Sequence, residues 1–122
     1  KFNYRRIYTT MTLIFISGPF RADNAWEVEQ NIRKAETLAL EVWKLDCACI
    51  CCHTNTRFFS GAAPDDVWLK GDLEILKRCD AVLLTDNWES SEGARAEVAE
   101  ARKLGIPILY NLGELTMFLI KG

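Results

Sequence analysis

Residues 81–110, AVLLTDNWESSEGARAEVAEARKLGIPILY, contain the succession of elements that decides the fold. The apolar run that opens this stretch predicts a buried strand, and the polar residues after it predict a loop. Ala94, Val98 and Ala101 then recur at helical spacing and define one apolar helix face. A second short apolar run, IPILY, closes the stretch. A strand, a helix and a strand in this order indicate two parallel strands joined by a crossover helix.

The rest of the chain repeats this alternation of strands and helices. The further predicted elements are a strand at 12–18, a helix at about 24–45, a strand at 47–52, a long loop at 53–64, a helix at 64–79 and a closing helix at 113–121. We therefore predict a single-domain α/β three-layer sandwich with a parallel, flavodoxin-like or Rossmann-like sheet of four to five strands. In such folds ligands bind beyond the carboxyl ends of the strands.

Length and composition limit the classes of function. A chain of 122 residues with 49% hydrophobic and 26% charged residues is typical of one soluble domain, and no apolar run approaches a membrane span. Residues 1–10 precede Met11 and resemble an N-terminal appendage, which leaves 11–122 as the domain. They lack the features of a secretory signal, so we expect a cytoplasmic protein. Residues 11–122 carry a net charge of −5, which disfavours polymeric nucleic acid as a partner.

Five cysteines raise the question of disulfides or a metal site. Their odd number and the lack of an export signal argue against disulfides. Cys47, Cys49 and Cys51 share one face of the predicted strand, with Cys52 opposite and His53 just beyond. This spacing matches no common zinc pattern. We therefore predict cysteines that act as small buried residues, and no metal or other cofactor.

A carboxylate stands on the apolar face of each of two predicted helices. Glu97 falls in the same arc as Ala94, and Asp72 falls in the arc that contains Leu69 and Leu76. Burying an ionised carboxylate without partners costs several kcal/mol, so each needs hydrogen bonds, a shared proton or a pocket. Each could also lean out to water or cap a backbone amide. Because both helices adjoin the predicted ligand edge, the pair suits cleavage of a glycosidic bond.

Several residues at the same edge are suited to an anionic group. Gly18 and Gly93 allow backbone amides to approach a ligand, and the second precedes a helix whose amino end is partly positive. Ser17, Ser91 and Arg21 add side-chain donors. Each also has an ordinary role: a turn before proline, a helix cap or a solvated loop residue. No Walker-type loop or GxGxxG run supports an NTP or a dinucleotide.

Two stretches carry a resemblance to a known family. FISGPFR at 15–21 and GDLEILKRCDAVLLTDNWESSEGARAEVAEARKLGIPIL at 71–109 resemble the nucleoside 2-deoxyribosyltransferase superfamily. The nearest likeness is to the small 2′-deoxynucleoside 5′-phosphate N-hydrolases and their uncharacterised phage and bacterial relatives. It spans roughly residues 12–110. Its most specific part is an aspartate and leucine, a Cys-Asp before a strand, and then S-x-G-x-x-x-E.

The resemblance implies roles for individual residues. Glu97 would be the nucleophile on C1′ of the sugar, and Asp72 would bind the sugar hydroxyls or assist departure of the base. Arg21, Ser91 and the amide near Gly93 would hold the 5′ end. The family's habit of pairing subunits implies a homodimer or a higher homo-oligomer.

Departures from the family pattern bear on the substrate. The transferases have an aspartate six residues before the glutamate, whereas the monophosphate hydrolases have serine, as Ser91 is here. A serine donates to a phosphate that an aspartate would repel, which favours the hydrolases. However, Arg95 replaces a second glycine of the hydrolases, and the first loop reads GPF, with Pro19, in place of GSI.

Three residues near the ligand edge are candidates for contact with a nucleobase. Trp88 could stack on the base or pack within its own loop. His53 and Asn55 could read the base edge, although a lone histidine also serves structural roles. The other tryptophans lie on predicted helices and are expected in the core or in subunit contacts: Trp26, Trp43 and Trp68.

The predicted function is that of a cofactor-free N-glycosidase. It would hydrolyse the base–sugar bond of a (deoxy)nucleoside 5′-monophosphate through a carboxylate nucleophile. A nucleoside 2-deoxyribosyltransferase is the first alternative, and a non-catalytic nucleotide-binding sensor or accessory protein is the second. In every case the expected partner is a small-molecule nucleotide or nucleoside, with no membrane.

Overall fold

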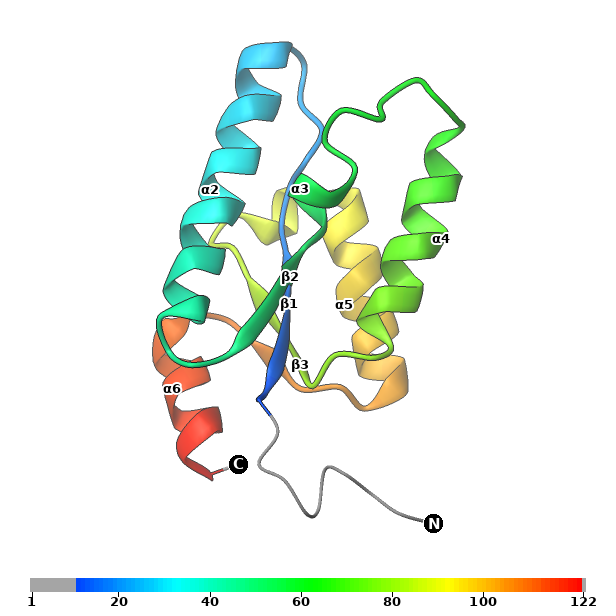
Figure 1. Cartoon of the computed structure of the whole chain (residues 1–122). Coiled ribbons are helices and arrows are strands. Elements are labelled where there is room, and N and C mark those ends of the chain that lie inside the picture. Colours follow the sequence, from blue (N-terminus) through cyan, green and yellow to red (C-terminus); the bar gives the residue numbers. More distant parts are fainter. Residues whose placement is uncertain (1–10, 122) are drawn as a thin grey trace.

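The computed structural model describes residues 11–121, which form one α/β domain around a four-stranded sheet (Figure 1). The strand order is β2-β1-β3-β4, and every adjacent pair is parallel. The strands are β1 (Leu13–Ser17), β2 (Ala48–Cys51), β3 (Ala81–Leu84) and β4 (Ile108–Leu109). The predicted fold class is confirmed. The predicted appendage at 1–10 lies outside the described residues.

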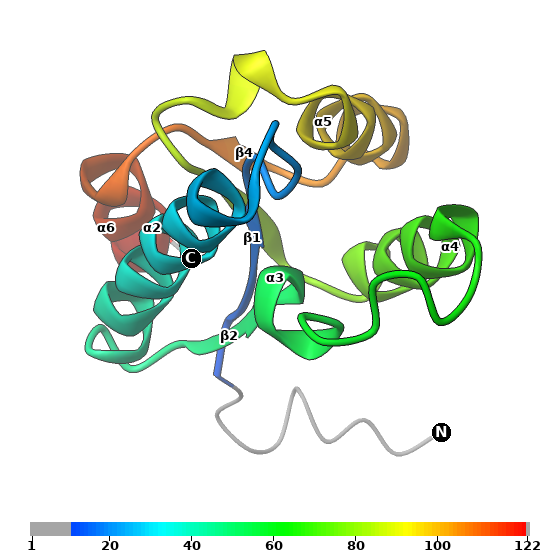
Figure 2. The same ribbon diagram turned by 90° about the horizontal axis from the view of Figure 1, so that it is seen from above.

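Helices cover both faces of the sheet. Figure 2 shows α2 and α6 together on one face and α4 and α5 on the other. The bounds are α2 (Ala25–Trp43), α3 (Cys52–Asn55), α4 (Asp65–Leu76), η1 (Trp88–Ser90), α5 (Glu92–Leu104) and α6 (Leu112–Lys121). The short α3 and η1 follow the carboxyl ends of β2 and β3. They therefore lie at the edge of the sheet where ligands bind in such folds.

The alternation of side chains along β1 divides the core into two clusters. Ile14 and Ile16 pack towards α2 and α6, in one cluster with Val42 and Leu115. Phe15 points to the other face, in a cluster that contains residues of α4 and α5. All five of these side chains are at most 1% exposed. Because β1 is central and buried on both faces, its carboxyl end is a fixed point for the loops around it.

Caps define the helix ends near the ligand edge. Asn24 caps α2 by accepting a hydrogen bond from the Glu27 amide at 2.8 Å. Ser91 caps α5 in the same way, with the Ala94 amide as donor at 3.0 Å. At the other end of α5, Gly105 adopts a left-handed φ of 73°, which glycine adopts without strain. The Ser91 cap therefore joins the loop after β3 to the start of α5.

Three details differ from the sequence prediction. The predicted loop at 53–64 begins with one helical turn, α3, which continues directly from β2. Leu69 was predicted to face the core but is 44% exposed, because it lies near the amino end of α4, where the core cluster does not extend. The core alternative is also wrong for Trp26 and Trp43, which are 73% and 53% exposed. Their role in subunit contacts stays a prediction.

No helix in the described part of the chain combines the length and apolar character that a membrane crossing requires.

Candidate active site

Glu97 is held at the carboxyl end of the central strand. It lies on α5 between the buried residues Ala94 and Val98, so the helix directs its carboxylate inward. Ser17, the last residue of β1, is fully buried and donates its Oγ hydrogen to Glu97 Oε1 at 2.6 Å. A hydroxyl on a buried strand fixes one carboxylate oxygen in place and leaves the other to meet a ligand.

The surroundings of Glu97 favour its protonated form. Burial raises its pKa from the ordinary 4.5 to about 7, the Ser17 hydrogen bond opposes this, and the negative charge of Asp72 adds to it. The rise places this carboxyl near half ionisation at neutral pH. Perturbed carboxyls of this kind are characteristic of catalytic sites.

Asp72 is the second carboxylate of the site and comes from the neighbouring helix α4. It is partly buried, and burial raises its pKa. The Cys52 thiol donates a hydrogen bond that acts in the opposite direction. Burial and the nearby charges of Asp72 and Glu97 raise the pKa of Cys52, so the thiol keeps its proton. These four side chains form one cluster. We call Glu97 and Asp72 the carboxylate pair, and Ser17 and Cys52 its two donors.

No cation within residues 11–121 forms an ion pair with either member of this pair. The two negative charges are therefore not neutralised by salt bridges. Because the charge of Asp72 raises the pKa of Glu97, the two carboxyls titrate together, and they favour a ligand that carries hydroxyl donors or develops positive charge.

Cys52 is the member of the cluster that the sequence prediction did not assign to the site. It was treated as one of five cysteines and weighed as a metal ligand or a core residue. The available signal was its position directly after a predicted strand, at the edge where ligands bind. Burial also raises the pKa of another cysteine thiol, that of Cys49 in β2, to about 12. Among the described residues, no group of three or more His, Cys, Asp or Glu side chains is arranged to hold a metal ion.

His53 is occupied by backbone contacts. Its Nε2 lies 3.1 Å from the Gly18 carbonyl and 2.9 Å from the Pro19 carbonyl, and the ring is buried. Burial lowers the pKa of this imidazole, although both carbonyl contacts oppose the shift. A neutral ring that donates from Nε2 ties α3 to the loop after β1. The position of His53 thus supports a structural role, and its contact with a base stays a prediction.

Gly18 has a steric role at the same place. A Cβ at this position would lie 2.3 Å from Thr85 Oγ1 at the end of β3. Only glycine allows β1 and β3 to approach so closely where they end. Gly93 meets no such obstacle, because a Cβ there would lie 3.8 Å from Ser91 Oγ.

The remaining predicted residues lie in the segments that follow β1, β2 and β3 at the ligand edge. Arg21 is exposed and forms an ion pair with Asp65 at the start of α4, at 2.6 Å. Asn55 ends α3 and is exposed. Trp88 lies in η1, packs against the core cluster of α4 and α5, and has its ring centroid 6.2 Å from that of Tyr110. That packing accounts for Trp88 without a ligand.

Arg95 has a defined partner near the amino end of α5. Its guanidinium donates to the Glu89 carbonyl at 2.6 Å and so ties η1 to α5. Ser91 accepts a hydrogen bond from the Ala94 amide, which leaves its own hydroxyl hydrogen able to donate to a ligand. The loop after β3 therefore combines a helix amino end with a serine donor, and both features favour an anion.

A family model described as Domain of unknown function (DUF7768) matches residues 12–111. The chain belongs to this family. Its structure is similar to that of a 2-deoxyribosyltransferase from the psychrotolerant bacterium Bacillus psychrosaccharolyticus, with a TM-score of 0.58 and 21% identity over 84% of this chain and 80% of that one. No curated protein matches the chain. At this identity the likeness establishes the shared fold, and the roles of residues must be argued from the site.

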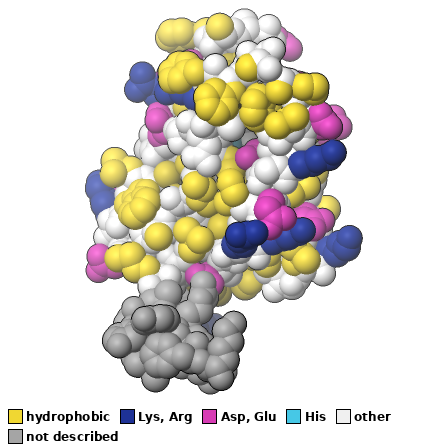
Figure 3. All heavy atoms as spheres, turned by 45° about the vertical axis from the view of Figure 1, so that its right-hand side comes forward, with side chains coloured by type: hydrophobic (Ala, Val, Ile, Leu, Met, Phe, Trp, Pro, Cys, Tyr) yellow, Lys and Arg dark blue, Asp and Glu magenta, His cyan; other side chains and the backbone are white. Residues whose placement is uncertain are grey.

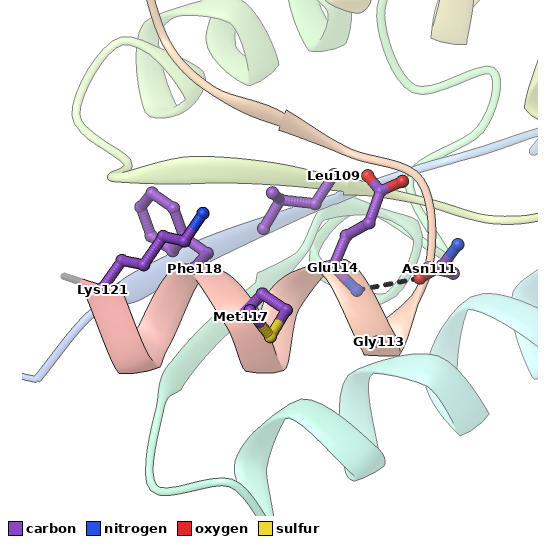
Figure 4. Close-up of a pocket in the computed structure, with 7 residues that line it drawn as sticks. All are labelled: Leu109, Asn111, Gly113, Glu114, Met117, Phe118 and Lys121. Carbon is purple, nitrogen blue, oxygen red and sulfur yellow. Dashed lines mark hydrogen bonds between the residues drawn. The ribbon is translucent and has the colours of Figure 1, made fainter.

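This DUF7768 domain also has an open hollow away from the carboxylate pair, on the face covered by α6 (Figure 4). Its volume is about 420 Å³, and it is lined by Leu109, Asn111, Gly113, Glu114, Met117, Phe118 and Lys121. The polar groups there stabilise the start of α6: the Glu114 amide donates to Asn111 Oδ1, and the Tyr110 amide donates to Glu114 Oε1, both at 2.9 Å. These side chains are engaged in capping and form no catalytic arrangement.

Proposed function

We propose that this chain is an N-glycosidase that hydrolyses the base–sugar bond of a (deoxy)nucleoside 5′-monophosphate. The observation that carries the proposal is the carboxylate pair: Glu97 is held by Ser17, with Asp72 beside it and no neutralising cation among the described residues. Two neighbouring carboxylates are the usual equipment for cleavage at an anomeric carbon.

We assign the two carboxylates different parts of the reaction, as the resemblance implies. A Glu97 oxygen forms a bond to C1′ while the bond from C1′ to the base nitrogen breaks, and the bonding electrons leave with the base. Asp72 binds the sugar hydroxyls or supplies the proton that the departing base takes up. Water then attacks C1′ while the ester bond to Glu97 breaks, and the water's proton passes to Asp72 or to solvent, which restores Glu97 and releases the sugar phosphate. This two-step course retains the configuration at C1′.

A 5′-phosphate suits the loop that precedes α5. Ser91 and the first amides of α5 are donors, and no carboxylate stands at position 91 to repel a phosphate. Arg21 lies at the same edge, where its partner Asp65 leaves it largely exposed. We infer that the phosphate competes with Asp65 for this guanidinium.

Transfer to a second base is the alternative with an observation in its favour, because the similar structure belongs to a 2-deoxyribosyltransferase. Both reactions proceed through the same glycosyl-enzyme. They differ in whether water or a base takes the sugar. An incubation with a nucleoside 5′-monophosphate and a second free base separates them, because only transfer produces the exchanged nucleotide.

The test is release of free base from a panel of ribo- and deoxyribonucleoside 5′-monophosphates, followed by chromatography. We expect base and sugar phosphate from the wild type and none from Glu97→Gln. Binding of nucleotides without release of base, unchanged in Glu97→Gln, would instead identify a sensor or accessory protein. The matched control is Glu100→Gln, because Glu100 lies on α5 but outside the carboxylate cluster.

A further inference from the structure

Trp68 carries the one buried side-chain nitrogen or oxygen in the described residues that has no hydrogen-bond partner, its indole Nε1. A buried donor without an acceptor costs roughly 1–3 kcal/mol. Native proteins contain few such groups, and each calls for a physical explanation. A ligand that supplies the missing acceptor is one explanation, provided that the indole lies where a ligand binds.

The position of Trp68 meets this condition. It precedes Asp72 by four residues on α4, so the two side chains lie on the same side of the helix, one turn apart. Trp68 is on the amino-terminal side, and the amino end of α4 lies at the same edge of the sheet as α3 (Figure 1). A nucleotide with its sugar at Asp72 and Glu97 and its base directed along α4 would therefore approach the indole.

Ion pairs hold both ends of the segment that lies against Trp68. Arg57 forms an ion pair with Glu29 of α2, and Asp65 forms one with Arg21. Between these anchors, the Phe59 ring lies against Trp68, with ring centroids 5.6 Å apart and an interplanar angle of 47°.

About half of the Phe59 side chain faces water, so the core does not enclose it. It is 49% exposed, and its neighbour Phe58 is 86% exposed. Figure 3 shows hydrophobic side chains gathered on the upper part of this face, with charged side chains below them. The backbone here closes local turns, such as the hydrogen bond from the Ala62 amide to the Phe59 carbonyl at 2.9 Å. Rotation of Phe59 breaks no hydrogen bond.

We propose that the indole N–H of Trp68 donates a hydrogen bond to an acceptor atom on the edge of the nucleobase, and that Phe59 moves aside to admit the base. This inference rests on the proposed function. Every nucleobase has ring nitrogens or carbonyl oxygens that accept such a bond, and its flat face suits an aromatic surface. Because the leaving base gains electrons as the bond to C1′ breaks, a donor on its edge also stabilises the transition state.

The experiment measures nucleotide binding in the Glu97→Gln background, where turnover is prevented. Calorimetry with 2′-deoxyguanosine and 2′-deoxycytidine 5′-monophosphates compares Trp68→Phe with its parent. Phenylalanine keeps an aromatic ring and removes the N–H. We expect affinity to fall about fivefold to tenfold for at least one of the two nucleotides, and no change for deoxyribose 5-phosphate, which lacks the base.

Thermal unfolding without ligand distinguishes a tryptophan that binds the base from one that only supports the fold. Removal of an unsatisfied buried donor leaves the melting temperature unchanged or raises it, while ligand affinity falls. Trp43→Phe is the matched control, because Trp43 ends α2 at the opposite edge of the sheet, and it should leave affinity unchanged. Phe59→Ala gives a second test, because loss of the ring that must move should tighten binding.

Equal affinity of the Trp68→Phe and parent proteins for both nucleotides overturns the inference, even if the wild type releases base. So does a failure of the parent protein to bind either nucleotide. Affinity that depends on Trp68 in a protein that releases no base supports the inference and removes only the catalytic proposal.

Discussion

Glu97 and Asp72 occupy equivalent places on two neighbouring helices, yet the protein holds them differently. Glu97 receives a hydroxyl hydrogen from Ser17, which is fully buried at the end of β1. Asp72 receives its hydrogen bond from the Cys52 thiol, and a thiol is a weaker donor. The stronger, more rigid hold on Glu97 suits a nucleophile that must meet one carbon atom. The weaker hold on Asp72 suits a group that exchanges partners with sugar hydroxyls.

The comparison also explains why both carboxyls are perturbed. Burial is the first cause of the raised pKa at each, and at Glu97 the charge of Asp72 contributes as well. The site in the free protein therefore resists holding two negative charges. In the proposed reaction, a transition state with positive charge on the sugar would relieve that repulsion, so the pair would stabilise the transition state more than the ground state.

The largest effect should come from removing the nucleophile. Glu97→Gln keeps the shape of the side chain and an oxygen that accepts from Ser17, but it cannot form the ester with C1′. We expect base release to fall on the order of 10³-fold or more. Initial rates by chromatography measure this, with Glu100→Gln as the control. Activity within tenfold of the wild type would show that the two carboxylates have been assigned the wrong roles.

Asp72→Asn should cost less, because the asparagine still hydrogen-bonds to the sugar but cannot carry the proton. We expect a loss of about 10²-fold in kcat. The control on the same helix is Glu74→Gln, since Glu74 forms exposed ion pairs with Lys77 and Arg78. A loss as great as that of Glu97→Gln would contradict a merely assisting role for Asp72.

Glu97 should lower the free energy of unfolding as pH rises. Its pKa is raised in the folded protein, from 4.5 to about 7. The unfolded chain therefore ionises first, and the free energy of unfolding falls between these pH values. Glu97→Gln removes this dependence, so its stability gain over the wild type should be near zero below pH 4.5 and reach about 3 kcal/mol above pH 7. Urea unfolding across pH measures the gain, and a constant difference would contradict the raised pKa.

The smallest effects should come from the two donors. Ser17→Ala removes the hydrogen bond that opposes the rise in the Glu97 pKa, so that pKa should rise further. Because the proposed nucleophile is the ionised carboxylate, the increase of kcat/KM with pH should then begin at a higher pH. Cys52→Ala should shift the Asp72 pKa upward by less, and Cys52→Ser should reverse that shift. Carboxyl carbon NMR titration of both residues measures these changes. A larger shift from Cys52→Ala than from Ser17→Ala would reverse the comparison.

The fold was predictable because its evidence is periodic. The apolar spacing of Ala94, Val98 and Ala101 and the continuous run at 81–84 each determine one element with its buried face. The two anomalous carboxylates were found by the same periodicity, since an acidic residue on an apolar face is visible in a single helix. The prediction that they lie at one edge followed from the parallel order of the strands.

The contacts between segments were not predictable in this way. Ser17 meets Glu97 across a sequence separation of 80 residues, and Cys52 meets Asp72 from a turn that was predicted to be part of a loop. The engagement of His53 with the Gly18 and Pro19 carbonyls likewise depends on tertiary packing. Residue type alone suggested that these side chains were polar and near the edge. Only the three-dimensional arrangement assigns their partners.

The most direct test of the account is to trap the sugar on the protein. Wild-type protein mixed with a deoxynucleoside 5′-monophosphate that it cleaves, quenched in acid within milliseconds to seconds and digested, is analysed by mass spectrometry. We predict a deoxyribose 5-phosphate ester on the peptide that contains Glu97, absent from Glu97→Gln. Base release that continues in Glu97→Gln, with no sugar on that peptide in the wild type, would contradict the account.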